Sequence, residues 1–119
     1  MFTCFIRYEI APGGLEAFKE YARAWIALVP KYGGTHHGYF LPGESGDVLP
    51  DASFSFPGVG VEGPPNIGVA LFSFPDLKSY ERYRRDVAED DACKEATARI
   101  NETRCFSRYE RSFLIPMFD

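Results

Sequence analysis

Apolar side chains recur along this chain at two spacings, and the order in which the two spacings alternate constrains the fold more than any other feature. Apolar residues at every second position are typical of a strand. Apolar residues every three or four positions, with charges between them, are typical of an amphipathic helix. The predicted strands cover residues 1–10, 35–41, 67–74 and 103–115. The predicted helices cover residues 15–29 and 77–87, with a further helical turn or two over 92–100.

The resulting order of strand, helix, strand, strand, helix, strand is the split βαβ, or ferredoxin-like, arrangement of the α+β class. One antiparallel sheet then carries both helices on a single face. The strand at 67–74 has apolar residues on both sides, so we expect it to be central. Phe5 places an apolar side chain on the second face of the first strand. Because that face needs a cover and symmetric dimers dominate soluble oligomers, we predict a homodimer packed sheet to sheet.

Length and charge limit what the chain can be. Its 119 residues are enough for one domain, 1–119, with a core of its own. The formal charge of −4 argues against a nucleic-acid-binding protein, which normally presents a concentrated basic patch. No apolar run approaches the ~20 residues of a membrane span, and no signal peptide is predicted. The three cysteines form no C-x-x-C pair, which predicts reduced thiols, a cytoplasmic location and no metal site.

The segment Pro42–Asn66 has a different composition from the rest of the chain. It is rich in proline and glycine, and its apolar residues follow neither the strand spacing nor the helix spacing. A connection of this length inside a small domain is generally functional or disordered. It also contains Pro64-Pro65, which favours the interpretation that this segment binds another protein.

A series of short motifs, in this order, resembles the NIPSNAP family within the dimeric α+β barrel superfamily. The motifs are Arg7-Tyr8, the Pro12-Gly13 turn before the first helix, Gly38-Tyr39-Phe40, the Tyr- and Arg-rich segment 74–85 and the acidic break Asp90-Asp91. The resemblance spans most of the chain except 42–66. It implies a ferredoxin-like subunit that pairs into a barrel-like dimer, and it implies little about chemistry. Related members of the superfamily include cofactor-independent monooxygenases, small-molecule isomerases and haem-binding enzymes.

Two adjacent histidines are candidates for acid–base chemistry. His36 and His37 lie on a predicted strand, so their side chains point to opposite faces and cannot bind one metal ion together. One of them is then expected to face the space between sheet and helices. The simpler interpretation is that both are structural or interfacial.

Four charges are predicted to lie side by side on neighbouring strands. Arg7 and Glu9 share one face of the first strand, and Arg108 and Glu110 share one face of the last. Opposite charges on adjacent strands form a cross-strand ladder that specifies register or an interface. A polar patch that binds an anionic or enol-bearing ligand is the alternative.

Aromatic residues supply the candidate pocket. Tyr8, Trp25, Tyr39 and Phe72 come from different predicted elements and would line an apolar pocket suited to a small aromatic molecule. Aromatic residues at these spacings are more often simply part of the core.

Two functions follow from these patterns. The first is a dimer that binds or transforms a small apolar or aromatic molecule between sheet and helices, in a monooxygenase-like reaction that needs no cofactor. His36, His37, Tyr39 and Arg7 are then the candidate catalytic residues. The alternative is a non-catalytic interaction or regulatory module that uses the dimer surface or the Pro/Gly-rich segment. Haem binding is a distant third, since the chain has histidines but no haem-specific motif.

Overall fold

The computed structural model describes residues 1–44 and 63–118, and within them four strands and three helices follow one another. The strands are β1 (Phe2–Ile10), β2 (Thr35–Phe40), β3 (Ile67–Phe74) and β4 (Phe106–Leu114). The helices are α1 (Leu15–Lys31), α2 (Leu77–Val87) and α3 (Asp91–Thr103). The predicted order of elements is confirmed, while most of the segment 42–66 lies outside the described residues.

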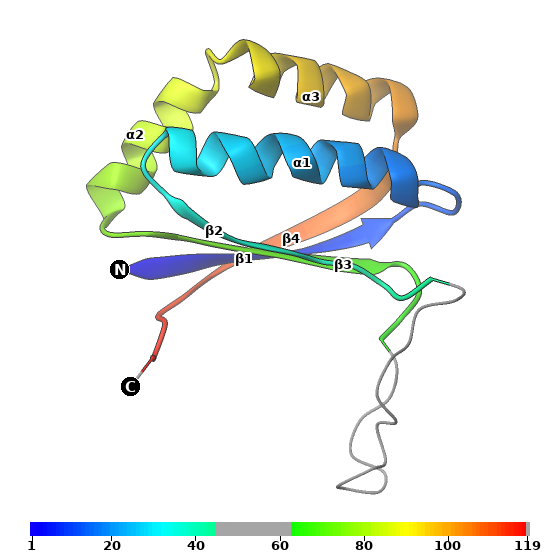
Figure 1. Ribbon diagram of the computed structural model, residues 1–119, viewed down its shortest axis with the longest axis horizontal. Coiled ribbons are helices and arrows are strands. Elements are labelled where there is room, and N and C mark those ends of the chain that lie inside the picture. Colours follow the sequence, from blue (N-terminus) through cyan, green and yellow to red (C-terminus); the bar gives the residue numbers. More distant parts are fainter. Residues whose placement is uncertain (45–62, 119) are drawn as a thin grey trace, which may run out of the picture.

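The four strands form one antiparallel sheet in the order β2-β3-β1-β4. β3 therefore lies inside the sheet, as the apolar residues on both of its sides predict. Figure 1 shows α1, α2 and α3 together on one face of this sheet. We call this the covered face and the opposite one the open face. The predicted ferredoxin-like α+β fold is confirmed.

Aspartate side chains start the two helices that follow β3. Asp76 accepts a hydrogen bond from the backbone N–H of Ser79 at 2.7 Å, and Asp90 accepts one from Ala92 at 2.8 Å. Each carboxylate satisfies an otherwise unpaired N–H group and lies at the positive end of its helix. The predicted interruption near Asp90 is confirmed, and it separates α2 from α3.

The last strand begins later than its sequence pattern predicts. Thr103 is the final residue of α3, where its hydroxyl donates to the carbonyl of Arg99 at 2.8 Å. Arg104 then ends the helix in the left-handed conformation, at φ 48°. β4 starts only at Phe106. Periodicity over so few residues does not distinguish the last helical turn from the first residues of a strand.

The core fills the space between the sheet and the helices. Phe18, Val29 and Phe74 are completely buried there. The ring of Phe74 packs on that of Tyr83 from α2, with centroids 4.8 Å apart. The cysteines are buried and free, in agreement with the predicted thiols, and burial raises the pKa of Cys4 to about 11. A buried thiol of such high pKa stays protonated and unreactive.

One buried carboxylate ties the end of α1 to the start of α3. Asp90 accepts a hydrogen bond from Lys31 Nζ at 2.6 Å and another from the Tyr32 hydroxyl at 2.5 Å. Lys31 and Tyr32 together hold the pKa of Asp90 well below its usual range. The ionised form of Asp90 is therefore the one that joins the two helices.

Candidate functional site

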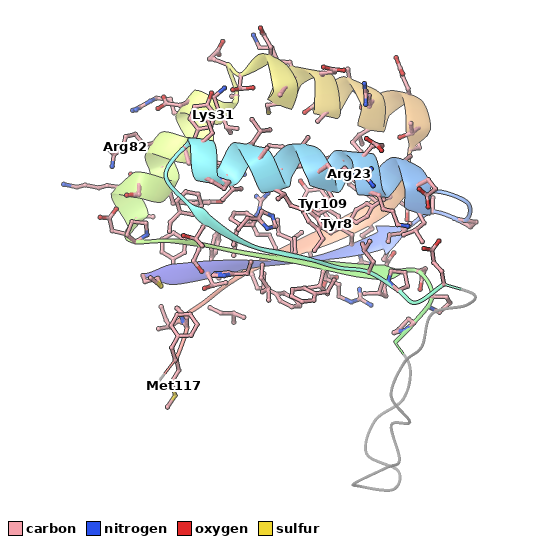
Figure 2. The ribbon with its side chains drawn as sticks, viewed as in Figure 1. Tyr8, Arg23, Lys31, Arg82, Tyr109 and Met117 are labelled. Atoms are coloured by element: carbon pink, nitrogen blue, oxygen red, sulfur yellow. The ribbon has the colours of Figure 1, made fainter. Side chains whose placement is uncertain are left out.

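A cavity of about 380 Å³ lies between the sheet and the helices, and residues from every strand and every helix line it. Aromatic residues are the largest group in its lining. The four residues predicted to line a pocket, Tyr8, Trp25, Tyr39 and Phe72, all belong to it. Figure 2 places Tyr8 and Tyr109 in the space between the sheet and α1. The volume is that of pockets that hold small organic ligands.

Tyr8 forms the centre of the aromatic floor and is 3% exposed. Its ring packs edge-on against Phe18, with centroids 5.0 Å apart, and against Phe106 at 5.1 Å. The ring of Tyr39 lies 6.1 Å away at a smaller tilt. Rings packed edge to face hold one another in place, so the floor of the cavity is preorganised.

The tyrosine hydroxyls of this floor are kept neutral. Burial raises the pKa values of Tyr8, Tyr21 and Tyr39 well above the ordinary value. The hydroxyl of Tyr8 interacts with those of Tyr21 and Tyr39. A neutral phenol donates one hydrogen bond and accepts others, so this group is suited to orienting a polar atom of a ligand rather than to removing a proton from it.

The indole of Trp25 contributes a buried donor without a partner. Within the described residues, its Nε1 and the Nε2 of His36 are the buried side-chain polar atoms that form no hydrogen bond. Leaving a buried N–H unpaired costs about 1–3 kcal/mol. Trp25 lines the cavity through other atoms of its side chain, since Nε1 itself is buried.

His36 lies behind the lining and is neutral. Its ring stacks on Tyr39 and Phe72, with centroids 5.2 and 5.6 Å apart, and both of these residues line the cavity. Burial lowers the pKa of His36 to about 4. The Nδ1 atom accepts a hydrogen bond from the Gly38 N–H at 2.9 Å, which places the proton of the neutral ring on Nε2. In this state His36 is a donor, and neither of its nitrogens is free to accept a proton.

A β-bulge decides which residues of β2 share a face. The register pairs His36 with Phe72 but Gly38 with Leu71, so one extra residue, His37, is inserted in β2. Gly38 has a φ of 107°, a conformation that favours glycine. Because of the bulge, His36 and Tyr39 lie on the same face although they are three residues apart.

Two arginines flank the mouth of the cavity. Arg84 from α2 and Arg111 from β4 are exposed and belong to its lining. The Arg111 guanidinium lies 5.9 Å from the centroid of the Tyr109 ring. The sequence interpretation missed both arginines. A signal existed for Arg111, because strict alternation along the last strand places it on the same side as Tyr109.

The four predicted catalytic residues are divided between the two faces of the sheet. Tyr39 lines the cavity and His36 packs against it, whereas His37 and Arg7 lie on the open face. The Nε2 of His37 is 2.7 Å from the Ser73 hydroxyl. The prediction that the histidines point to opposite faces is confirmed. Arg7 and His37 do not join the other two at the cavity.

The four charges of the predicted ladder lie side by side on the open face, but their ion pairs do not run between the strands as predicted. The register places Arg7 opposite Glu110 and Glu9 opposite Arg108. The ion pairs themselves run along each strand, with Arg7 Nη1 3.7 Å from Glu9 Oε1 and Arg108 Nη2 2.9 Å from Glu110 Oε1. The ladder therefore combines cross-strand alignment with pairing within each strand.

A second hollow of about 460 Å³ lies between α1 and α3. Alanines and the charged side chains of Glu20, Arg23, Glu95 and Arg99 line most of it. These charges pair on their own helices, Arg23 with Glu20 and Arg99 with Glu95. Although larger, this hollow offers neither an aromatic floor nor an unpartnered buried donor within the described residues. We therefore take the aromatic cavity as the candidate site.

Comparison with known proteins places the sequence beside one family. Residues 3–53 match the model of the NIPSNAP family. The matched segment includes β1, α1 and β2, and the predicted resemblance to the NIPSNAP family is confirmed. No curated protein matches the chain.

Solved structures with the same fold include NIPSNAP proteins. An uncharacterised NIPSNAP domain protein from Burkholderia xenovorans is 18% identical, with a TM-score of 0.66, over 99% of this chain and 96% of that one. A NIPSNAP family protein of unknown function from Agrobacterium tumefaciens is 19% identical, with a TM-score of 0.70, over 100% and 91%. A protein from Nitrosomonas europaea, provisionally assigned as an antibiotic biosynthesis monooxygenase, is 11% identical, with a TM-score of 0.60, over 99% and 100%. At these identities the similarity concerns the fold.

Two features are absent from residues 1–44 and 63–118. No helix there is long and apolar enough to cross a membrane. In the same part of the chain, no group of three or more His, Cys, Asp or Glu side chains is arranged to hold a metal ion.

Proposed function

We propose that the cavity between the sheet and the helices binds a small aromatic molecule. The observation that carries this proposal is the aromatic lining with the unpartnered N–H of Trp25 among it. A flat apolar ring would gain contact with Tyr8, Tyr39 and Phe72. A rotation of the Trp25 side chain would let an acceptor atom on the ligand pair with its buried indole N–H. Burying a drug-sized molecule on such a floor removes apolar surface from water, which is the main source of its affinity.

The predicted site residues take different roles in this proposal. Tyr39 would contact the ligand directly, and His36 would hold the Tyr39 and Phe72 rings in place by stacking against them. His37 and Arg7 lie on the open face and would not contact a ligand in the cavity.

A reaction on the bound molecule is a further step of the proposal. The Nitrosomonas europaea protein of similar fold motivates a cofactor-independent, monooxygenase-like reaction, but its identity to this chain is 11%. His36 would have to lose its hydrogen bond from Gly38 before it could act as a base. Binding is therefore the function that the geometry supports best, and turnover stays a prediction.

Binding can be tested through the single tryptophan of the chain. Its indole N–H gives one resolved signal in a ¹H–¹⁵N spectrum, and Trp25 lines the cavity. We expect a saturable shift of this signal when 2-naphthamide, a neutral two-ring aromatic probe, is added at up to millimolar concentration. The shift reflects a hydrogen bond or ring contact at the indole.

Matched variants locate the binding. Thr97 lines the aromatic cavity and Thr103 lines the hollow between α1 and α3, both on α3 and both exposed. Thr97→Phe should fill the mouth and weaken binding at least tenfold, whereas Thr103→Phe should leave it unchanged. The proposal fails if the indole signal shows no saturable shift, or if Thr97→Phe binds the probe as the unmodified chain does.

We also propose that a second copy of the chain covers the open face. Phe40 and Leu114 are 54% and 51% exposed on the outer strands β2 and β4, and Phe5 and Leu71 lie half-buried between them. A two-fold interface must be self-complementary, and the ladder of alternating arginines and glutamates offers both signs to a rotated copy. Sedimentation velocity should give a dimer for the unmodified chain and a monomer for Phe40→Glu. A monomer at 100 μM protein in the unmodified chain would contradict this proposal.

The alternative, a non-catalytic interaction or regulatory module, depends on the segment 42–66, most of which lies outside the described residues. It stays a prediction, as does the cytoplasmic location, which rests on the cysteine pattern.

A further inference from the structure

We infer that the molecule bound in the aromatic cavity is an aromatic acid, whose carboxylate lies at the mouth between Arg84 and Arg111. This inference rests on the proposed function and names the chemical class of its ligand. It comes from the charge of the mouth, which the aromatic floor alone does not explain.

The two arginines come from the two layers of the fold, one from a helix and one from the sheet. Arg84 lies on α2, and Arg111 lies on β4 in register with Ile6 of β1. Ile6 is buried in the cavity lining, so Arg111 emerges directly from the edge of the apolar floor. The remaining polar side chains of the mouth, Thr97 and Asn101 on α3, are uncharged.

Neither arginine has a carboxylate partner among the described residues, whereas an arginine close to each of them does. Arg85, next to Arg84 on α2, pairs with Asp86 at 3.1 Å, and Arg108 on β4 pairs with Glu110 at 2.9 Å. The described lining of the cavity contains two arginines and no aspartate or glutamate. In a chain with a net charge of −4, this mouth is locally positive.

Guanidinium chemistry favours a carboxylate here. The planar fork of an arginine binds both oxygens of a carboxylate, and the bond to an ionised acceptor is about twice as strong as a neutral one. A flat ring on the floor near Tyr8 and Trp25 would leave an acidic substituent at the mouth, where both guanidinium groups are exposed. An exposed arginine without a ligand is simply solvated, so the test must separate these two situations.

The experiment compares an acid with its neutral amide. 2-Naphthoate and 2-naphthamide have the same ring and nearly the same shape, and calorimetry gives the dissociation constant of each. We expect 2-naphthoate to bind at least tenfold more tightly than 2-naphthamide at low salt. Arg111→Met and Arg84→Met keep an apolar side chain and should each weaken binding of the acid several-fold more than binding of the amide.

Two other arginine variants serve as matched controls. Arg108→Met removes a charge from the open face of β4, and Arg85→Met removes one from α2 outside the cavity lining. Neither should change the preference for the acid. Because each of the four arginines is exposed, we expect all four variants to fold. Their unfolding midpoints show whether a loss of binding reflects a loss of stability instead.

The outcomes separate this inference from the proposed function. If the amide binds as tightly as the acid, or if Arg108→Met and Arg85→Met reduce the preference as much as Arg84→Met and Arg111→Met, the acid class is wrong and the aromatic pocket stands. If neither probe shows saturable binding, the pocket and the inference both fall.

Discussion

The two faces of the sheet use alternate residues of the same strands for different purposes. On β1, Cys4, Ile6 and Tyr8 point to the covered face and are at most 4% exposed. Phe5 and Arg7, between them, point to the open face and are partly exposed. The core lies on the covered face, and the aromatic cavity lies within it. The open face keeps a mixed surface of apolar side chains, charges and hydroxyls.

The difference teaches where rigidity lies in this fold. The covered face is organised by interlocking rings, from Phe18 and Tyr8 to Phe74 and Tyr83, whose positions depend on close packing. The open face is organised by polar pairs such as Thr3 with Ser73, whose hydroxyl oxygens are 2.6 Å apart. Packing defects should therefore be costly on one face, and charge changes should be inexpensive on the other.

The largest effect is expected from truncating a core ring. Phe74→Ala should lower the free energy of unfolding by about 3–5 kcal/mol, because the fully buried ring leaves a cavity that its neighbours cannot fill. Phe5→Ala on the open face should cost less than half as much at protein concentrations where the chain is monomeric. Urea unfolding followed by circular dichroism measures both. Equal losses in the free energy of unfolding for the two variants, measured on the dilute monomer, would contradict this difference between the faces.

An intermediate effect is expected from the buried histidine. The pKa of His36 is lowered to about 4 in the folded chain, so between pH 6.5 and pH 4 the unfolded chain binds more protons and stability falls as the pH falls. We expect this loss to be about 1–2 kcal/mol between pH 7 and pH 5, because solvent partly screens the ring. His36→Asn keeps an acceptor for the Gly38 N–H and removes the titration.

Urea midpoints at the two pH values provide the measurement for His36. The unmodified chain should lose more stability than His36→Asn over this interval. Parallel losses in the two proteins would show that His36 is not the group that titrates.

The smallest effect is expected on the charge ladder. Arg7→Ala removes an ion pair whose atoms are 3.7 Å apart and whose side chains are 40% and 33% exposed, so it should cost less than about 1 kcal/mol. The cost should shrink further at 1 M salt, where exposed charges are screened. A loss above 2 kcal/mol that persists in high salt would mean that this face is buried in solution.

Local patterns in the sequence were enough to predict the strands and helices of this fold. Alternation predicted β1, apolar residues on both sides predicted that β3 is central, and the spacing of apolar residues predicted α1. Each of these features depends on residues within a few positions of one another, and their order leaves few topologies. Four of the aromatic residues that line the cavity, Tyr8, Trp25, Tyr39 and Phe72, were also predicted from such local patterns.

Only the tertiary structure decided how the polar groups are distributed around the cavity. The bulge at Gly38 brings His36 to the side of Tyr39, which alternation alone does not predict. Arg84 and Arg111 meet at one mouth because α2 and β4 pack against the same floor, although the two residues are far apart in the chain. The periodicity of a strand or helix is determined by neighbouring residues in the sequence, whereas the position of a charge beside a cavity depends on long-range packing and register.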